Sequence, residues 1–224
     1  MTIDQIEKAF KNKELFNQAL THRSWINENP GIRGTNERLE FLGDAILEFI
    51  VSERIYRDFP DKEEGFLTAL RSNIVNTQNL SEYATKIDLG KHLLLSKGEE
   101  QGGGRNNGSL LADTVEAIIG SIFIDRGFQA AADFIEKNLL SDIHSKLEKP
   151  LKDAKSRLQE MVQSKGFSAP KYKVVEETGP DHNKIFNVEV LINSKSLASG
   201  TGKSKSIAEQ SAAQAALEEL SKNA

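Results

Sequence analysis

Three acidic residues interrupt an apolar stretch in the segment 36–45, NERLEFLGDA. Glu37, Glu40 and Asp44 are spaced i, i+3 and i+7, so an α-helix places them on one face. The apolar residues of this segment and its continuation cover most of the helix circumference and predict a helix buried in a core: Leu39, Phe41, Leu42, Ala45, Ile46, Phe49 and Ile50. Ionised carboxylates are costly in a core, so Glu40 and Asp44 need a cation beside them.

A second acid pair, Asp113 and Glu116, is spaced i, i+3 in the nearly all-apolar segment 109–125, SLLADTVEAIIGSIFID. Two apolar helices that each offer two carboxylates on one face predict a shared cluster of oxygen ligands. With no histidine or cysteine nearby, such a cluster favours Mg²⁺ or Mn²⁺ over zinc or copper. The alternative is that the acids lie on ordinary solvated faces. It is less favoured because both pairs fall in the two most apolar helices.

The segment NERLEFLGDA resembles the signature of the ribonuclease III family, Mg²⁺-dependent endonucleases of double-stranded RNA, and SLLADTVEAIIGSIFID resembles the family's second catalytic helix. Segments 19–29, 63–76 and 97–109 are also similar to family segments, in the expected order. The resemblance implies a metal cluster made of four carboxylates: Glu40, Asp44, Asp113 and Glu116. Within it, Asp44 and Glu116 are the expected catalytic pair. Glu37 and Glu64 match the family's auxiliary acids.

The chain has 224 residues, no cysteine and a net charge of −4. Residues 1–150 carry 24 acidic against 18 basic residues, whereas residues 151–224 carry 9 against 11. An acidic part that holds a divalent metal and a mildly basic part that meets phosphates suit a metal-dependent nuclease. The sequence has neither an apolar run of membrane-spanning length nor a signal-peptide core, so we expect a cytoplasmic protein without a membrane partner.

Helical periodicity dominates residues 1–147, and Pro150 interrupts a charged stretch after them. We therefore predict a catalytic domain over 1–147, a linker over 148–152 and a second domain over 153–224. The second domain has the order α-β-β-β-α, with strands predicted at 171–178, 185–192 and 196–200. It resembles the double-stranded-RNA-binding domain. The predicted fold class is an all-α catalytic domain followed by a small α+β domain.

In the second domain the resemblance implies contacts with duplex RNA, which is recognised mostly by shape through 2′-hydroxyls and phosphates. The expected contact residues are Ser156, Gln159 and Gln163 on the first helix, His182 in a loop, and Lys203 and Lys205 at the last helix. Relatives commonly have a basic pair where this chain has Lys205 and Ser206. Ser206 is expected to form a capping box with Glu209.

A glycine-rich loop is predicted at 97–109, and it lacks the GK[ST] ending of a nucleotide-binding loop, so no nucleotide cofactor is expected. The resemblance offers Arg105 and Asn106 as contacts with the RNA backbone, and Asn107 stands where many relatives have a basic residue. Ser109 is a candidate cap for the following helix.

Two motif residues have an alternative structural interpretation. For His22, a partly buried structural role is favoured over that of a general base, because a metal-activated water needs no histidine. For Glu37, a partnership with an N-cap at Thr35 or Asn36 is as well supported as the auxiliary role.

The resemblance implies a homodimeric endoribonuclease that cuts double-stranded RNA with Mg²⁺, or with Mn²⁺ in its place. The products implied are 5′-phosphate and 3′-hydroxyl ends with short 3′ overhangs, and the roles implied are ribosomal RNA precursor processing and RNA turnover. One rival is a non-catalytic RNA-binding regulator of the same fold, which the complete set of acids disfavours. The other, a di-iron helical bundle, requires Glu-x-x-His pairs that the sequence lacks.

Overall fold

The computed structural model describes residues 1–31, 34–141, 153–180 and 184–222. It divides the chain into two compact units, Met1–Leu151 and Lys152–Ala224. The predicted linker at 148–152 lies outside the described residues.

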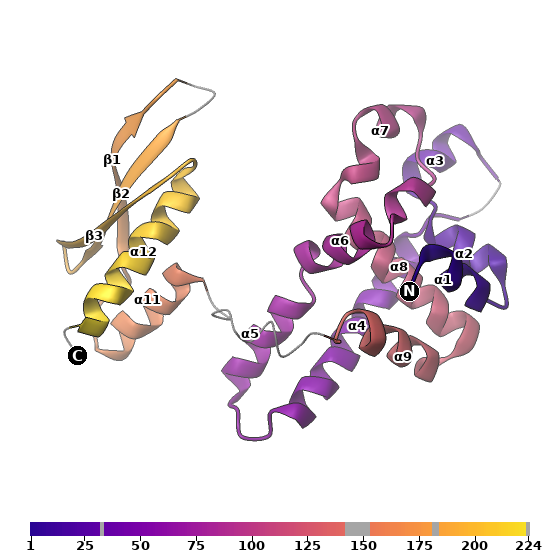
Figure 1. Ribbon diagram of the computed structural model, residues 1–224, viewed down its shortest axis with the longest axis horizontal. Helices are drawn as coiled ribbons and strands as arrows, with labels where there is room; N and C mark the ends of the chain where they lie inside the picture. The colour runs from indigo at the N-terminus through magenta and orange to yellow at the C-terminus, as the bar shows by residue number, and fades with distance from the viewer. Residues whose placement is uncertain (32–33, 142–152, 181–183, 223–224) are drawn as a thin grey trace. The chain divides into compact units, whose positions relative to one another are not determined.

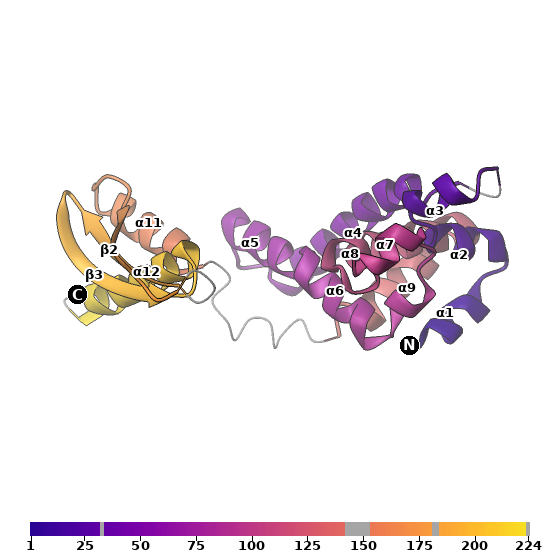
Figure 2. The same ribbon diagram turned by 90° about the horizontal axis from the view of Figure 1, so that it is seen from above.

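The first unit is helical through its described residues, as Figures 1 and 2 show, which confirms the predicted all-α class. A single isolated bridge between Thr21 and Leu94 is the one β-type pairing described in this unit. Its helices are α1 (Ile3–Ala9), α2 (Lys13–Ala19), α3 (Arg23–Glu28), α4 (Glu37–Asp58), α5 (Glu64–Ile74), α6 (Thr77–Lys86), α7 (Lys97–Gln101), α8 (Gly108–Arg126) and α9 (Phe128–Asn138), with short 3-10 turns η1 (Leu89–His92) and η2 (Gly104–Asn106).

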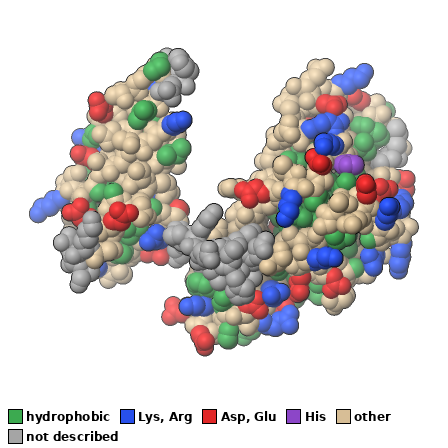
Figure 3. Space-filling view, in the orientation of Figure 1, with side chains coloured by type: hydrophobic (Ala, Val, Ile, Leu, Met, Phe, Trp, Pro, Cys, Tyr) green, Lys and Arg blue, Asp and Glu red, His purple; other side chains and the backbone are tan. Residues whose placement is uncertain are grey.

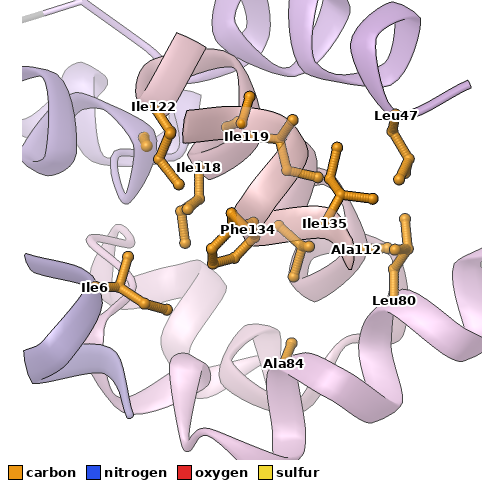
Figure 4. Close-up of a cluster of buried hydrophobic side chains, with 14 of the residues drawn as sticks. Ile6, Leu47, Leu80, Ala84, Ala112, Ile118, Ile119, Ile122, Phe134 and Ile135 are labelled. Atoms are coloured by element: carbon orange, nitrogen blue, oxygen red, sulfur yellow. The ribbon is translucent and has the colours of Figure 1, made fainter. Parts of the chain in front are cut away.

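Helix α8 is the central element of the first unit and packs against α2, α4, α6 and α9. Its interior residues Val115, Ile118 and Ile119 are at most 1% exposed, and Figure 4 shows the isoleucines pointing into a cluster with side chains of neighbouring helices. Asn107 caps the helix by accepting from two backbone N–H groups, so the cap is Asn107 and not the expected Ser109. No described helix is long and apolar enough to span a bilayer.

Helix α4 differs from the prediction of a helix buried all round. Leu39, Ile46 and Ile50 are buried as expected, but Phe41 is 80% exposed and Phe49 58% exposed, and Ala45 is exposed with them. The apolar composition of a helix face predicts that the face is buried, but it does not predict which surface covers it. The described residues of this chain leave one apolar face of α4 uncovered.

The glycine-rich segment is more ordered than a loop. Helix α7 occupies its first five residues and η2 follows, with Gly103 in the left-handed region at φ +85°. The segment is therefore a folded connection into α8.

The second unit has the predicted α-β-β-β-α order: α11 (Ala154–Ser164), β1 (Lys171–Thr178), β2 (Ile185–Ile192), β3 (Lys195–Gly202) and α12 (Lys205–Lys222). The strands form an antiparallel sheet in the order β1-β2-β3. Val188 and Val190 of the central strand are fully buried with Leu158 and Val162 of α11 and the alanine face of α12. The two helices therefore cover one face of the sheet.

Candidate active site

Helices α4 and α8 cross with their backbones in contact at two glycines. A Cβ atom on Gly43 would lie 1.8 Å from the carbonyl oxygen of Glu116, and one on Gly120 would lie 2.2 Å from that of Leu39. No side chain fits at either position, so this crossing requires glycine on both helices. The two glycines were not among the residues singled out from the sequence, although a glycine inside an apolar helical segment is a signal of close packing.

The crossing brings together three of the four predicted metal ligands. Carboxylate oxygens of Glu40, Asp113 and Glu116 lie within 4.8 Å of one another, and all three side chains are partly buried. Asp44 follows Glu40 by one turn of α4 and is exposed. It is not part of the three-residue group, but its charge acts on both Glu40 and Glu116.

Burial and mutual repulsion make these carboxylates weak acids. Burial raises the pKa of Glu116 to about 8, with further contributions from the charges of Asp44 and Asp113. Burial also raises the pKa of Glu40, followed by repulsion from Asp113. The pKa of Asp113 is raised by burial, and the nearby His22 opposes that rise.

The cluster fits a hard divalent cation. Burial and the negative charges of neighbouring acids raise the pKa of both Glu40 and Glu116, so negative charge is unfavourable at this cluster. Three converging carboxylates without sulfur or imidazole donors among them are a donor set that Mg²⁺ or Mn²⁺ prefers. A cation placed between them would supply the missing positive charge.

A polar cavity of about 270 Å³ adjoins the cluster. Its lining includes Glu40 and Asp113, together with His22, Arg23, Asn36, Glu37 and Thr114. The Glu37 carboxylate accepts a hydrogen bond from Thr35 Oγ1 at 3.0 Å and lies 3.8 Å from Arg23. Asn36 is the N-cap residue of α4 but makes no side-chain cap bond, so of the two partners considered for Glu37 at the helix start only Thr35 is hydrogen-bonded to it.

Glu64 does not lie with the acidic cluster in this chain. It begins α5, accepts a hydrogen bond from Thr68 Oγ1 at 3.0 Å, and lines a different cavity, of about 390 Å³, between α4 and α5. This cavity is largely apolar and includes Phe49, Tyr56 and Leu67. The sequence placed Glu64 among the functional acids, and the fold places it at an apolar groove.

Arg105 has many partners within the fold. Its guanidinium donates to the carbonyl oxygens of Gly90 at 2.9 Å and Leu93 at 3.1 Å, and to the Glu100 carboxylate at 2.6 Å. Asn106 beside it is exposed. Arg105 therefore holds the segment that leads into α8, and its contact with RNA stays a prediction.

In the second unit, Gln159 and Gln163 are exposed along α11. Ser156, one turn earlier, is half-buried and hydrogen-bonds through both its N–H and its hydroxyl to Asp153, which caps the helix. His182 lies outside the described residues. Acidic and basic side chains are interspersed on the face that Figure 3 shows, so the basic side chains of this unit do not form one continuous positive patch there.

Lys203 and Lys205 are both exposed near the start of α12. The Lys205 ammonium lies 3.2 Å from Glu177 Oε1 and over the Phe186 ring at 5.6 Å. The prediction of a capping box formed by Ser206 and Glu209 is wrong. The helix begins earlier, so Ser204 accepts from the Ile207 N–H.

Glu209 instead pairs with Lys155 Nζ at 2.6 Å. This ion pair joins α12 to α11, because Lys155 lies in the first turn of α11. Its role is therefore in the packing of the two helices.

Comparison with known proteins identifies both parts of the chain. A "Ribonuclease-III-like" family model matches residues 12–143, and a "Double-stranded RNA binding motif" model matches residues 154–220. Ribonuclease 3 of Borreliella afzelii is 43% identical over 221 residues, covering 97% of this chain and 89% of the relative. Ribonuclease 3 of Geobacillus kaustophilus is 44% identical over 218 residues with the same coverage.

A solved structure of the nuclease domain of ribonuclease III from Campylobacter jejuni is also similar. It shares 39% identity with a TM-score of 0.55 and covers 62% of this chain and 99% of that chain. In the Campylobacter domain, the region involved in dimer formation is structurally flexible.

Proposed function

The chain belongs to the ribonuclease III family of double-stranded-RNA-specific endoribonucleases, and we propose that it hydrolyses its substrate with a divalent cation, Mg²⁺ or Mn²⁺, held at the crossing of α4 and α8. The observation that carries this proposal is the convergence of the Glu40, Asp113 and Glu116 carboxylates within 4.8 Å of one another.

The chain's own residues hold and orient the cation and keep the site in shape. Glu40, Asp113 and Glu116 supply oxygen ligands from two helices whose backbones are in direct contact at Gly43 and Gly120. Asp44, exposed beside them, is open to solvent and therefore accessible to a substrate. A bound divalent cation would provide a nucleophilic water at neutral pH and stabilise charge on the phosphodiester. We assign the leading catalytic roles to Asp44 and Glu116.

The second unit supplies affinity for duplex RNA. We propose that Gln159, Gln163 and Ser156 on α11 reach 2′-hydroxyls, that Lys203 and Lys205 meet phosphates, and that residues 148–152 link this unit to the catalytic one. The matched RNA-binding motif supports this assignment. Contacts of these two kinds are the ones on which duplex recognition by shape depends.

We propose that the catalytic unit forms a homodimer through the uncovered face of α4. Phe41, Ala45 and Phe49 lie on this face, and Tyr56 at 72% exposure continues it. The apolar cavity between α4 and α5 adjoins it and can receive an aromatic side chain from a second copy. Glu64 lines that cavity, which favours a role for this auxiliary acid at the dimer contact.

The dimer is tested by one substitution and a matched control. Phe41→Ser removes an 80%-exposed aromatic ring from the proposed interface and should shift the protein toward monomer in light scattering. Phe167→Ser, which changes a 46%-exposed ring in the second unit, should leave the mass unchanged. A Phe41→Ser protein with the wild-type mass would exclude this face.

Two active sites in a dimer, each cutting one strand, would leave 5′-phosphate and 3′-hydroxyl ends with short 3′ overhangs. Ribosomal RNA precursors and other duplex transcripts in the cytoplasm are the proposed substrates. The deciding experiment incubates a long RNA duplex and a single strand of the same sequence with Mg²⁺ or with a chelator. We expect cleavage of the duplex with Mg²⁺ alone, and mapping of the ends to show the overhang. Duplex binding without cleavage in either Mg²⁺ or Mn²⁺ would instead identify the non-catalytic regulator.

A further inference from the structure

His22 lines the polar cavity beside the acidic cluster, and its ring is held by hydrogen bonds on one side. His22 Nδ1 lies 2.8 Å from Ser24 Oγ and accepts from the Ser24 backbone N–H at 3.3 Å. The Ser24 hydroxyl in turn accepts from the Ser96 backbone N–H at 3.0 Å. Because the lone pair of Nδ1 is engaged by a backbone donor, the neutral ring carries its proton on Nε2.

The backbone around this histidine is also fixed. The His22 N–H donates to the Leu94 carbonyl at 3.1 Å, and the Leu94 N–H donates to the Leu20 carbonyl at 2.9 Å. These bonds join the segment before α3 to the segment before α7, which are far apart in the sequence. The ring therefore has a defined orientation, with Nδ1 toward Ser24 and the opposite edge available to the cavity.

The cavity edge of His22 adjoins carboxylates. Glu40 and Asp113 line the same space of about 270 Å³, and His22 is close enough for its charge to act on Asp113. Arg23, the cationic side chain in that lining, lies against Glu37 at 3.8 Å. The Nε2 edge of His22 therefore lies on the same cavity as Asp113, a proposed metal ligand.

We propose that His22 is a positioning residue that orients the Asp113 carboxylate for the cation through its Nε2–H. This inference rests on the proposed function, since it concerns how the metal ligands are held. A carboxylate that binds a cation with one oxygen keeps a second oxygen that needs a donor, and such outer partners fix the orientation of the ligand. The structural role at Nδ1 and the positioning role at Nε2 use opposite edges of one ring.

Two substitutions separate the two edges. His22→Asn keeps a side-chain oxygen at the Nδ1 position, where asparagine is a good N-cap, but removes the Nε2–H. His22→Gln places an amide N–H near the Nε2 position and loses the cap. His92→Asn, at an exposed histidine in η1 that does not line the cavity, is the control. The measurements are Mn²⁺ affinity by calorimetry on the RNA-free protein and the melting temperature of each variant.

We expect His22→Asn to weaken Mn²⁺ binding about tenfold while keeping the wild-type melting temperature. His22→Gln should lower the melting temperature yet bind Mn²⁺ almost as tightly as wild type. His92→Asn should change neither quantity. Wild-type Mn²⁺ affinity in His22→Asn overturns the proposal, and so does an equal loss of affinity in both His22 variants. Absence of Mn²⁺ binding by the wild-type protein overturns the metal cluster itself, which distinguishes failure of the proposed function from failure of the role of His22.

Discussion

The proposed catalytic site at the crossing of α4 and α8 and the proposed RNA-binding face of the second unit are built in opposite ways. At the crossing, three carboxylates converge within 4.8 Å where two helix backbones touch. On the second unit, the proposed RNA-contact residues are exposed: Gln159 and Gln163 on α11, Lys203 in the turn before α12, and Lys205 at the start of α12. Burial couples the groups of the first site to one another, whereas exposure to water leaves those of the second nearly independent. Substitutions should therefore have large effects at the crossing and small, additive effects on the RNA-binding face.

The largest effect is expected from Glu116→Gln. The substitution preserves the shape of the side chain but removes a ligand charge, so the cleavage rate should fall by about a thousandfold or more, the equivalent of several kcal/mol of transition-state stabilisation. Duplex affinity should persist because it resides in the other unit. Single-turnover cleavage and a binding assay in Ca²⁺ or chelator measure the two quantities. Glu82→Gln, at an exposed site on α6, is the control and should cut at the wild-type rate. Near-wild-type cleavage by Glu116→Gln would show that the acidic cluster at the crossing of α4 and α8 is not the catalytic site.

Gly43→Ala tests whether the backbone contact creates the site. The added methyl group would lie 1.8 Å from the Glu116 carbonyl oxygen, so the helices must separate. We expect a loss of stability at or above the ~1–3 kcal/mol of ordinary overpacking, with reduced cleavage even where the protein is folded. Gly98→Ala is the matched control, because a Cβ there meets nothing within 4 Å. Thermal melts that are equal for the two variants would contradict the close crossing.

The same crossing shows what the sequence could and could not predict. The spacing of Glu40, Asp113 and Glu116 within apolar segments is a local pattern, and the structure brings these three residues together. The three strands were also predictable because alternation and turns are local signals. β1 and β2 match the predicted ranges, and β3 extends beyond its range to Lys195–Gly202.

Features set by partners distant in the sequence were missed. The exposure of Phe41 and Phe49 depends on which surface covers α4, and apolar composition cannot report this. The hydrogen bonds from Arg105 to the carbonyls of Gly90 and Leu93 depend on how the fold brings these segments together, and no sequence motif predicts this. The sequence predicts helix caps at Ser109 and Ser206, whereas the structure has them at Asn107 and Ser204. The position of a cap is hard to predict where several adjacent polar residues can each cap the helix.

A pH-dependent stability is expected from the crossing and not from the RNA-binding face. Burial raises the pKa of Glu116 to about 8 from its ordinary value of 4.5. Between these two pH values the folded state keeps a proton that the unfolded state has lost, so the free energy of unfolding falls as pH rises, by at most ~1.4 kcal/mol per pH unit. Below the lower value both states are protonated, and the penalty is absent. Bound Mg²⁺ should replace the proton and remove most of the fall.

Melting temperatures of the metal-free protein across this pH window measure the effect. Glu116→Gln carries no titrating group at this position, so its melting temperature should fall less steeply with pH than that of wild type. Equal slopes for the two proteins, or a slope that Mg²⁺ does not change, would show that the carboxylates of the crossing are not coupled in the way proposed.

Replacing Lys203 and Lys205 together with alanine should have a smaller effect that is uniform across RNA sequences. If each lysine neutralises one phosphate, the slope of log affinity against log salt should decrease in magnitude by roughly 1 to 2. The cleavage rate at saturating RNA should stay unchanged, because the acidic cluster is intact. A wild-type salt slope in the double variant would place the phosphate contacts elsewhere on the second unit.

The smallest effect is expected from Glu177→Gln. This substitution also tests whether the residues of the RNA-binding face act independently of one another. Glu177 holds Lys205 at 3.2 Å with both side chains substantially exposed, a kind of pair worth up to ~1 kcal/mol. A phosphate must compete with Glu177 for the same ammonium, so removing its charge should tighten duplex binding a few-fold at low salt, with the gain lost at high salt. Glu176→Gln makes the same change in net charge at the preceding residue of β1, so it controls for the general electrostatic effect of removing one negative charge. In a Lys205→Ala background the advantage of Glu177→Gln over Glu176→Gln should vanish, because the pair no longer exists. If the advantage persists there, the glutamate acts on RNA directly, and the face is more strongly coupled than its exposure indicates.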